Sequence, residues 1–467
     1  MLGLILILLA VIAFLIAWRY PQMVFYAWIA TAPLIGWTAK FSTGYYNFFG
    51  RTIGGSIELG VGELVAGALF AAWLVRLIFF KQKQKIFLPL FGAFGLIVAA
   101  HLLSVLSPLH PDAIAILKYS LRPVLWAYIA CVLLPANFLR SRRDLIISLA
   151  ILSALGAWFA LQGIYAMRYG SDDQTIYPRA HPLSLFGVYP IGNNHNVLAE
   201  FLAFVAPCAL ALGVLIRSRL WRRIAFVIAG LTTFAALLTF ARSAWIVLAV
   251  ETGFLSVTLW WPWIKKNLAV VTVLVFAFLP LGWFMLSFMN QTGVQSSTDT
   301  RLMLSQLAYS FFRQSPVVGA GAGTFVDRVS QIWIFNYEFG APLDSHGLLQ
   351  KVMAETGVVG LLALALFGLA LIRHLYRTTR VFIAHKPDLQ VYLYLAAAVI
   401  GAFVYQLFNT TYWTSHLWFP VGIVLAAGFI FQDVLTAGGA GGEVSTRSQM
   451  SPTNRERVEY RRRQDPL

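Results

Sequence analysis

Charged residues are scarce in this chain, at 12% of its 467 residues, whereas a soluble domain carries roughly 25%. Hydrophobic residues make up 59%, and the mean hydropathy is +0.72. Apolar runs of about 17–25 residues, each long enough to cross a bilayer, recur along the sequence. The alternating segments of about 10 residues that form a transmembrane β-barrel are absent. The sequence therefore predicts an all-α polytopic membrane protein.

Cysteine is almost absent as well. Cys131 and Cys208 both lie inside predicted spans, which indicates buried thiols and excludes a disulfide framework. No cluster with metal-ligand spacing is visible, so we expect no metal and no cofactor. The N-terminal run lacks a basic region and a small-residue cleavage site, which predicts an uncleaved span.

The net charge of +16 does not indicate a nucleic-acid partner, because no basic patch is interleaved with exposed aromatic residues. The basic residues instead fall in short loops between spans, as the positive-inside rule expects. This rule places one set of loops on the cytoplasmic side, together with the C-terminal tail: 81–85, 140–144, 217–223, 265–266 and 373–380.

We expect about 12–13 transmembrane helices, with the N-terminus on the outer side. Their predicted bounds are near 2–18, 22–37, 59–80, 86–107, 113–135, 145–168, 195–216, 223–240, 243–261, 267–288, 347–372, 390–408 and 417–436. Three parts follow: N-terminal helices over 1–190, a transmembrane core over 190–435 and a disordered basic cytoplasmic tail over 436–467.

Three polar segments face the opposite, outer side: 169–194, 289–346 and 409–416. The long segment 289–346 precedes the third-last helix. Within it, residues 298–314 predict an amphipathic helix on the membrane surface, ended by Pro316. The "GAGAG" at 319–323 reads as a flexible turn, because its spacing does not fit a nucleotide-binding loop.

Arg242 stands in the middle of the apolar stretch "LLTFARSAWIVLAV", where a cation costs about 2.5–3.5 kcal/mol by insertion scales. It either snorkels to interfacial water or joins Arg301 and His346 in one cavity on the outer side. Paired guanidinium groups suit a diphosphate, because their planar donor forks match phosphate oxygens.

His346 is a candidate general base, because imidazole titrates near neutral pH. The alternative is a histidine in the first turn of a helix capped by Asp344 or Ser345. Glu355 lies nine residues further on, which is the opposite face of a helix and about 13 Å away. We therefore interpret Glu355, Glu63 and Glu251 as buried structural carboxylates.

The stretch "GNNHNVLAEF" at 192–201 is a dense polar entry to a span. Its polar residues either bind sugar hydroxyls or cap the helix: Asn193, Asn194, His195 and Asn196. Glu200 is expected to pair within the bundle, as are Lys118 and Arg122 in the fifth span. Arg179 either joins the site or lies on the loop without a role in the site.

Four stretches in this order resemble the O-antigen ligase and polymerase superfamily: "GNNHNVLAEF", "TFARSAW", "TRLMLSQLAYSFFRQSPVVGAGAGTF" and "DSHGLLQKVMAETGVVGLL". The similarity covers about residues 190–430, while the N-terminal third matches only in hydropathy. One departure is that the family often has Ser-Arg-Gly where this chain has Ala241-Arg242-Ser243.

The resemblance implies a bacterial inner-membrane glycosyltransferase of the type C class, working at the periplasmic face. Its donor would be an undecaprenyl-diphosphate-linked glycan, and its acceptor a glycan or lipid A-core. The transfer would be inverting and would need no metal. By the same resemblance Arg242 and Arg301 bind the diphosphate, and His346 activates the acceptor.

The sequence leaves polymerase and ligase open, because no feature reports the acceptor. The alternative from another class is a lipid-linked glycan transporter or flippase. Such folds often show internal repeats with broken helices at midplane. No repeat is visible here, and the candidate charges gather at one face, which favours an enzyme.

Overall fold

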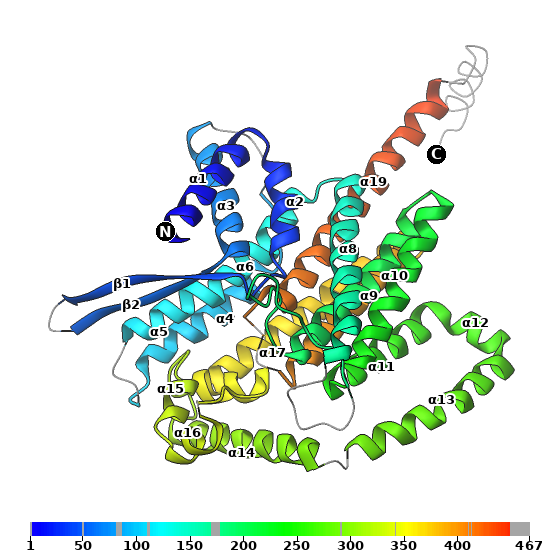
Figure 1. Cartoon of the computed structure of the whole chain (residues 1–467). Helices are drawn as coiled ribbons and strands as arrows, with labels where there is room; N and C mark the ends of the chain where they lie inside the picture. The colour runs from blue at the N-terminus through cyan, green and yellow to red at the C-terminus, as the bar shows by residue number, and fades with distance from the viewer. Residues whose placement is uncertain are drawn as a thin grey trace, which may run out of the picture.

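The structure, a computed structural model, describes residues 2–48, 51–80, 86–109, 113–169, 178–289, 292–340, 342–409, 411 and 413–448. It is a bundle of helices with one β-hairpin (Figure 1). The N-terminal elements are α1 Leu2–Arg19, α2 Pro21–Thr31, β1 Thr38–Phe48, β2 Arg51–Gly60, α3 Val61–Phe79, α4 Phe91–Leu103, η1 Ser104–Leu106, α5 Ala113–Tyr119, η2 Ser120–Leu125, α6 Trp126–Tyr128, η3 Ile129–Leu133, α7 Leu134–Phe138, α8 Arg142–Ala166 and η4 Met167–Tyr169.

The remaining elements form the second part of the bundle and the segment below it. They are α9 His195–Leu215, α10 Arg219–Leu238, α11 Arg242–Leu255, η5 Ser256–Trp260, α12 Trp261–Lys266, α13 Leu268–Met289, α14 Thr292–Gln314, α15 Phe325–Ser330, α16 Trp333–Phe339, α17 Leu348–Phe382, α18 Lys386–Gln406 and α19 Ser415–Ser448.

Among the described residues, nine helices are long and apolar enough to cross a membrane, and Leu8–Arg19 and Phe91–Leu106 are shorter apolar helices. The predicted polytopic helical membrane protein is confirmed. The expected span over 22–37 is wrong in length, because α2 has only 11 residues. A β-hairpin follows it, which the all-α prediction did not contain.

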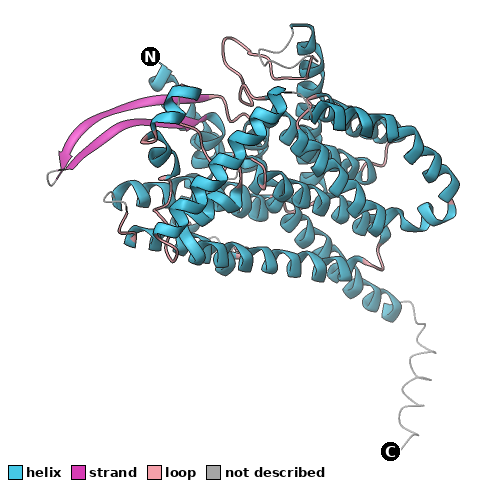
Figure 2. Cartoon of the chain, turned by 90° about the horizontal axis from the view of Figure 1, so that it is seen from below, coloured by secondary structure: helices cyan, strands magenta, loops and turns pink. Residues whose placement is uncertain are grey.

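The hairpin pairs β1 and β2 antiparallel, from Thr38 opposite Gly60 to Phe48 opposite Arg51. The register is irregular between Ser42 and Tyr45. Figure 2 shows this hairpin (magenta) reaching well beyond the helices. Successive side chains of a strand point to opposite faces, so a hairpin needs no long apolar run. Hydropathy therefore gave no signal for this element.

The helices around α9 form the centre of the core. α9 is buried almost along its whole length and packs against α8, α10 and α18. Gly156 of α8 lies where a larger side chain would collide with Val205 and Thr232, so its small size lets three helices meet. The two cysteines are buried free thiols, as predicted.

Several helix ends meet at one end of the bundle, which we call the site end. The end of α10 meets the loop before α9, since Ala180 N–H donates to Leu238 O at 2.8 Å. The end of α18 meets the start of α9, since the Tyr405 hydroxyl donates to Asn196 O. The starts of α9, α11 and α17 lie at this end, so three helix N-termini face it.

The segment between α13 and α17 forms a small core of its own. Buried residues of α14, α15 and α16 pack together and against Ala354 of α17: Leu304, Ala308, Phe311, Phe325, Val329 and Phe335. The predicted helix over 298–314 is confirmed as part of α14, whereas its place on the membrane surface stays a prediction. In Figure 1 this segment lies along the lower edge of the bundle.

The last helix, α19, continues to Ser448. The expected start of the disordered tail at 436 therefore falls within this helix. Residues 449–467 lie outside the described part of the chain.

Candidate functional site

Arg242 is the first residue of α11, directly after a tight turn. Phe240 adopts a left-handed conformation with φ 54°, and the Thr239 hydroxyl accepts from Ala241 N–H at 3.2 Å. The turn splits the apolar run into two helices, which the sequence also placed near this position. Arg242 Nη1–H donates to the Thr298 hydroxyl at 2.7 Å, which joins α11 to α14.

Arg301 lies one helical turn beyond Thr298 on α14 and interacts electrostatically with Arg242. Burial lowers the Arg301 pKa first, and the charge of Arg242 lowers it further. Within the described ranges, no carboxylate lies at ion-pair distance from either guanidinium. Two like charges are therefore held together, partly buried, without a balancing anion.

His346 lies in the irregular segment just before α17. The helix begins at Leu348 with Gly347 as N-cap, so the expected capping by Asp344 or Ser345 is wrong and His346 is not in the first turn. A side chain at position 347 would reach within 2.8 Å of Leu407 O, so Gly347 lets this segment press against the end of α18. His346 is thereby fixed by packing at the site end.

The His346 imidazole also interacts with Arg301. Burial lowers its pKa first, the Arg301 charge lowers it further, and Asp344 opposes both. The sum keeps the ring neutral near pH 7, as a proton acceptor must be. The structure therefore brings together Arg242, Arg301 and His346, the three residues that the sequence named as catalytic or diphosphate-binding.

His195, at the start of α9, extends the same cluster. Arg179 is buried and donates from Nη1 to His195 Nε2 at 2.9 Å, and His195 also interacts with Arg301. Asn194 serves as the helix cap, because its side chain accepts from Asn196 N–H at 2.8 Å. Arg179 thus joins the site, whereas Asn194 follows the capping interpretation. Asn193 is exposed.

Ser243 follows Arg242 and carries the hydroxyl that the family pattern places before the arginine. It forms a side-chain hydrogen bond with Tyr405, whose own hydroxyl donates to Asn196 O. The start of α11 is therefore tied to α18 and α9.

Lys351 anchors the segment that carries His346. Its Nζ lies 2.7 Å from Asp344 Oδ2 and 3.6 Å from Glu355 Oε1, and its side chain is 6% exposed. Asp344 also accepts from Ser345 N–H at 2.8 Å. Sequence reasoning missed Lys351, although a lysine and a glutamate four residues apart in an apolar helix were a signal for it.

Glu355 binds the backbone of the "GAGAG" loop and does not pair with His346. Its carboxylate accepts from Gly323 N–H at 2.8 Å and from Phe325 N–H at 3.1 Å. The structural interpretation of Glu355 is confirmed, whereas the expected flexible turn is wrong. Gly319 has φ 72°, and a Cβ there would lie 2.2 Å from the Glu355 backbone, so only glycine fits.

Glu200 pairs within the bundle, as predicted. Its carboxylate accepts from Gln406 and, at 2.6 Å, from Thr411, and lies 3.6 Å from His416 Nδ1. Arg122 also has a carboxylate partner, since its Nη2 lies 3.3 Å from Glu63 Oε2. The interpretation of Glu63 as buried is wrong, because its side chain is 35% exposed and lines a cavity.

The cluster has the parts that transfer from an anionic leaving group requires. The two guanidinium groups and three helix N-termini present positive potential at one place. A neutral imidazole lies beside them. The arrangement can bind a dianion, stabilise negative charge that develops on it and accept a proton from a hydroxyl.

Residues 227–365 match a protein family described as O-Antigen ligase. The matched segment contains Arg242, Arg301 and His346, whereas Arg179 and His195 precede it. No curated protein matches the chain. The family implies a glycosyltransferase-like enzyme of O-antigen assembly. The chain is therefore a multi-pass membrane protein with a segment that matches the O-antigen ligase family, and this match supports the predicted resemblance to the O-antigen ligase and polymerase superfamily.

Proposed function

We propose that the protein transfers a glycan from undecaprenyl diphosphate to a sugar hydroxyl of an acceptor at the periplasmic face of the bacterial inner membrane. The reaction is inverting and uses protein cations where other enzymes use a metal ion. The donor is lipid-linked, and the acceptor is a second lipid-linked glycan or lipid A-core. The site end of the bundle faces the periplasm in this proposal, because the positive-inside rule assigns the opposite helix ends, which carry the described basic loops such as 140–144 and 217–223, to the cytoplasm.

The pair of arginines without a carboxylate carries the proposal. Arg242 and Arg301 repel each other and lose hydration, and among the described residues no anion offsets this cost. Proteins retain such an arrangement where an anionic substrate supplies the missing charge. A diphosphate fits, because each of its phosphate groups matches one planar donor fork.

The chemistry follows from the positions of these groups. The acceptor hydroxyl oxygen attacks the anomeric carbon, and its proton passes to a nitrogen of His346. The bond from the anomeric carbon to the diphosphate oxygen breaks, and its electron pair stays on that oxygen. Arg242 and Arg301 stabilise the negative charge that develops there. One attack from the opposite face inverts the anomeric centre.

Arg179 and His195 have a supporting role. Their pair adds a third guanidinium near Arg301 and lies at the start of α9. We propose that Arg179, His195 and Asn196 contact the glycan or the acceptor, and that Asn194 contributes through the helix start that it caps.

The test uses purified wild-type protein in liposomes with the native undecaprenyl-diphosphate-linked oligosaccharide. Glycan products are separated on a gel, with and without lipid A-core. A ladder of lengths from donor alone identifies a polymerase, and products that appear only with lipid A-core identify a ligase. The proposal fails if a donor proven with the native membranes gives no new glycosidic bond under either condition, which favours a transporter.

A further inference from the structure

Two cavities outside the arginine cluster meet at an ion pair in the N-terminal part of the bundle. One has a volume of about 340 Å³ and the other about 410 Å³, and both are in the roughly 300–1,000 Å³ range of small-ligand sites. They share four lining residues: Glu63, Arg122, Trp126 and Trp413. Neither is lined by Arg242, Arg301 or His346.

The ion pair is unusual for its position. Arg122 lies within the candidate span Ala113–Phe138. The side chains of Arg122 and Glu63 are 37% and 35% exposed, and both residues line the two cavities. Glu63 is near the start of α3, where its carboxylate also accepts from Gly60 N–H at 2.9 Å, whereas Arg122 lies inside a candidate span, where an ionisable group indicates a functional site. Arg122 also lies in the π-helical turn η2, which contains Pro123, and π-helical turns recur at functional sites.

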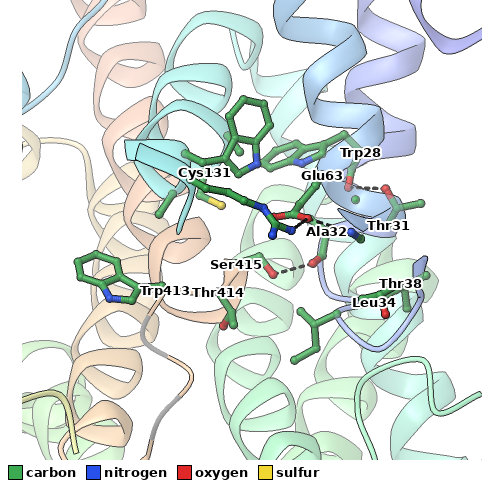
Figure 3. Close-up of a pocket in the computed structure, with 17 residues that line it drawn as sticks. Trp28, Thr31, Ala32, Leu34, Thr38, Glu63, Cys131, Trp413, Thr414 and Ser415 are labelled. Carbon is green, nitrogen blue, oxygen red and sulfur yellow. Dashed lines mark hydrogen bonds and ion pairs between the residues drawn. The ribbon is translucent and has the colours of Figure 1, made fainter. Parts of the chain in front are cut away.

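The walls combine indole rings with hydroxyl groups. Figure 3 shows Glu63 near the middle of the first cavity, with Trp28, Trp413, Thr414 and Ser415 around it. The Trp413 ring is held by stacking on Trp418, with centroids 5.8 Å apart and planes at 7°. Pre-positioned indoles accept the apolar faces of sugar rings, and charged and hydroxyl groups take the sugar hydroxyls.

A chain of contacts links the second cavity to the histidine. Tyr119 lines this cavity, and Lys351 Nζ lies 5.8 Å from the centre of its ring. Lys351 pairs with Asp344, two residues before His346. No residue of the 342–351 segment lines either cavity, so the link from the second cavity to the segment that carries the proposed base runs through Tyr119, Lys351 and Asp344.

We infer that these two cavities form the subsite for the acceptor oligosaccharide, with Glu63 and Arg122 binding sugar hydroxyls and Trp126 and Trp413 stacking on sugar rings. The inference rests on the proposed function, since it assigns this glycan to the acceptor side. An acyl chain fits less well, because the ion pair and the hydroxyl groups would lie against hydrocarbon.

The test compares wild type with Glu63→Gln, which keeps the shape of the side chain and removes its charge. The probe is the lipid-free oligosaccharide released from the native lipid-linked glycan, and its Kd is measured by calorimetry on protein in nanodiscs. We expect Kd for this probe and KM for the acceptor to rise roughly 10-fold or more, with donor KM unchanged, since hydrogen bonds to charged groups are the strong ones.

Asp388→Asn is the matched control, because it breaks the Arg142–Asp388 ion pair, 2.6 Å long, away from the site end. It should leave both constants unchanged. If Glu63→Gln does not yield folded protein, Trp126→Leu decides in its place. The inference is overturned if Kd and acceptor KM are unchanged in the folded variant. It is also overturned if the variant loses co-purified phospholipid while both constants stay unchanged, because the cavities then hold lipid.

The outcomes also separate the subsite from the proposed function. Wild-type protein that binds the oligosaccharide through Glu63 but forms no glycosidic bond supports the subsite and contradicts the transfer. Wild-type protein that transfers glycan, with Glu63→Gln unchanged in all constants, supports the transfer and contradicts the subsite.

Discussion

Two groups of buried and partly buried charges in this molecule differ in how they are balanced. Lys351 lies between Asp344 and Glu355, and both carboxylates also accept hydrogen bonds from backbone N–H groups. Arg242 and Arg301 have no carboxylate at ion-pair distance among the described residues. A balanced cation serves the fold, whereas an unbalanced pair keeps positive potential for a substrate.

The comparison gives opposite expectations for the two groups. Removal of one member of a balanced buried network leaves an uncompensated charge and destabilises the protein. Removal of an unbalanced cation relieves repulsion and desolvation, so it lowers activity without lowering stability. The predictions below begin with the largest expected effect.

His346→Ala should reduce kcat for glycan transfer about 10²–10⁴-fold, because general base catalysis contributes that much. Product formation from the lipid-linked donor measures it. His385→Ala is the control, because His385 is exposed and lies before α18 at the end away from the site. If His346→Ala has the same kcat as wild type, His346 is not the proton acceptor of the proposed reaction.

Arg301→Ala should reduce kcat about 10²–10³-fold, the usual cost of losing one group that stabilises charge in the transition state. Its melting temperature in detergent should stay equal to that of wild type or rise. Arg313→Ala is the control, because Arg313 is an exposed residue of the same helix. A marked drop in melting temperature with Arg301→Ala would show that this cation is structural.

Lys351→Met should lower the free energy of unfolding by about 3–5 kcal/mol, because two carboxylates lose their shared cation. Denaturant or thermal unfolding in detergent measures the change, and Lys386→Met, at an exposed position, is the control. Adding Glu355→Gln to Lys351→Met should recover part of the loss. Equal stability of Lys351→Met and wild type contradicts the distinction between the two groups.

The pH dependence tests the link between Arg301 and His346. The base acts when neutral, so kcat/KM should fall as pH drops through the His346 pKa, which burial and Arg301 hold below 6.5. Arg301→Gln removes one of these two causes and should move the acid limb upward, towards 6.5. Arg313→Gln should leave the limb in place. A wild-type limb above 6.5 is incompatible with this assignment.

Much of the membrane architecture was predictable, because an apolar run long enough to cross a bilayer has few other stable forms. The prediction was weakest between residues 22 and 60, where a short helix and the β-hairpin replace a full span. The amphipathic helix around Arg301 was also predictable, from the spacing of its apolar residues.

The candidate site was predictable in its members but not in its framework. Arg242, Arg301 and His346 stand out because charged groups are rare in such a chain. Lys351 did not, because its partners Asp344 and Glu355 are read as a cap and a core carboxylate until the fold brings them together. The "GAGAG" loop was predicted to be flexible, because its glycines give no sign that the Glu355 carboxylate, distant in sequence, binds its backbone.

The sequence by itself determined that this protein spans the membrane many times and holds arginines and a histidine where lipid makes them costly. Only the tertiary structure decided which of those charges are balanced. The reason is that the balance depends on distances of a few ångströms between groups far apart in the chain, such as Glu63 and Arg122. Hydropathy and spacing determine how deep a residue lies in the membrane and which side it faces, whereas packing determines the partner of each charge.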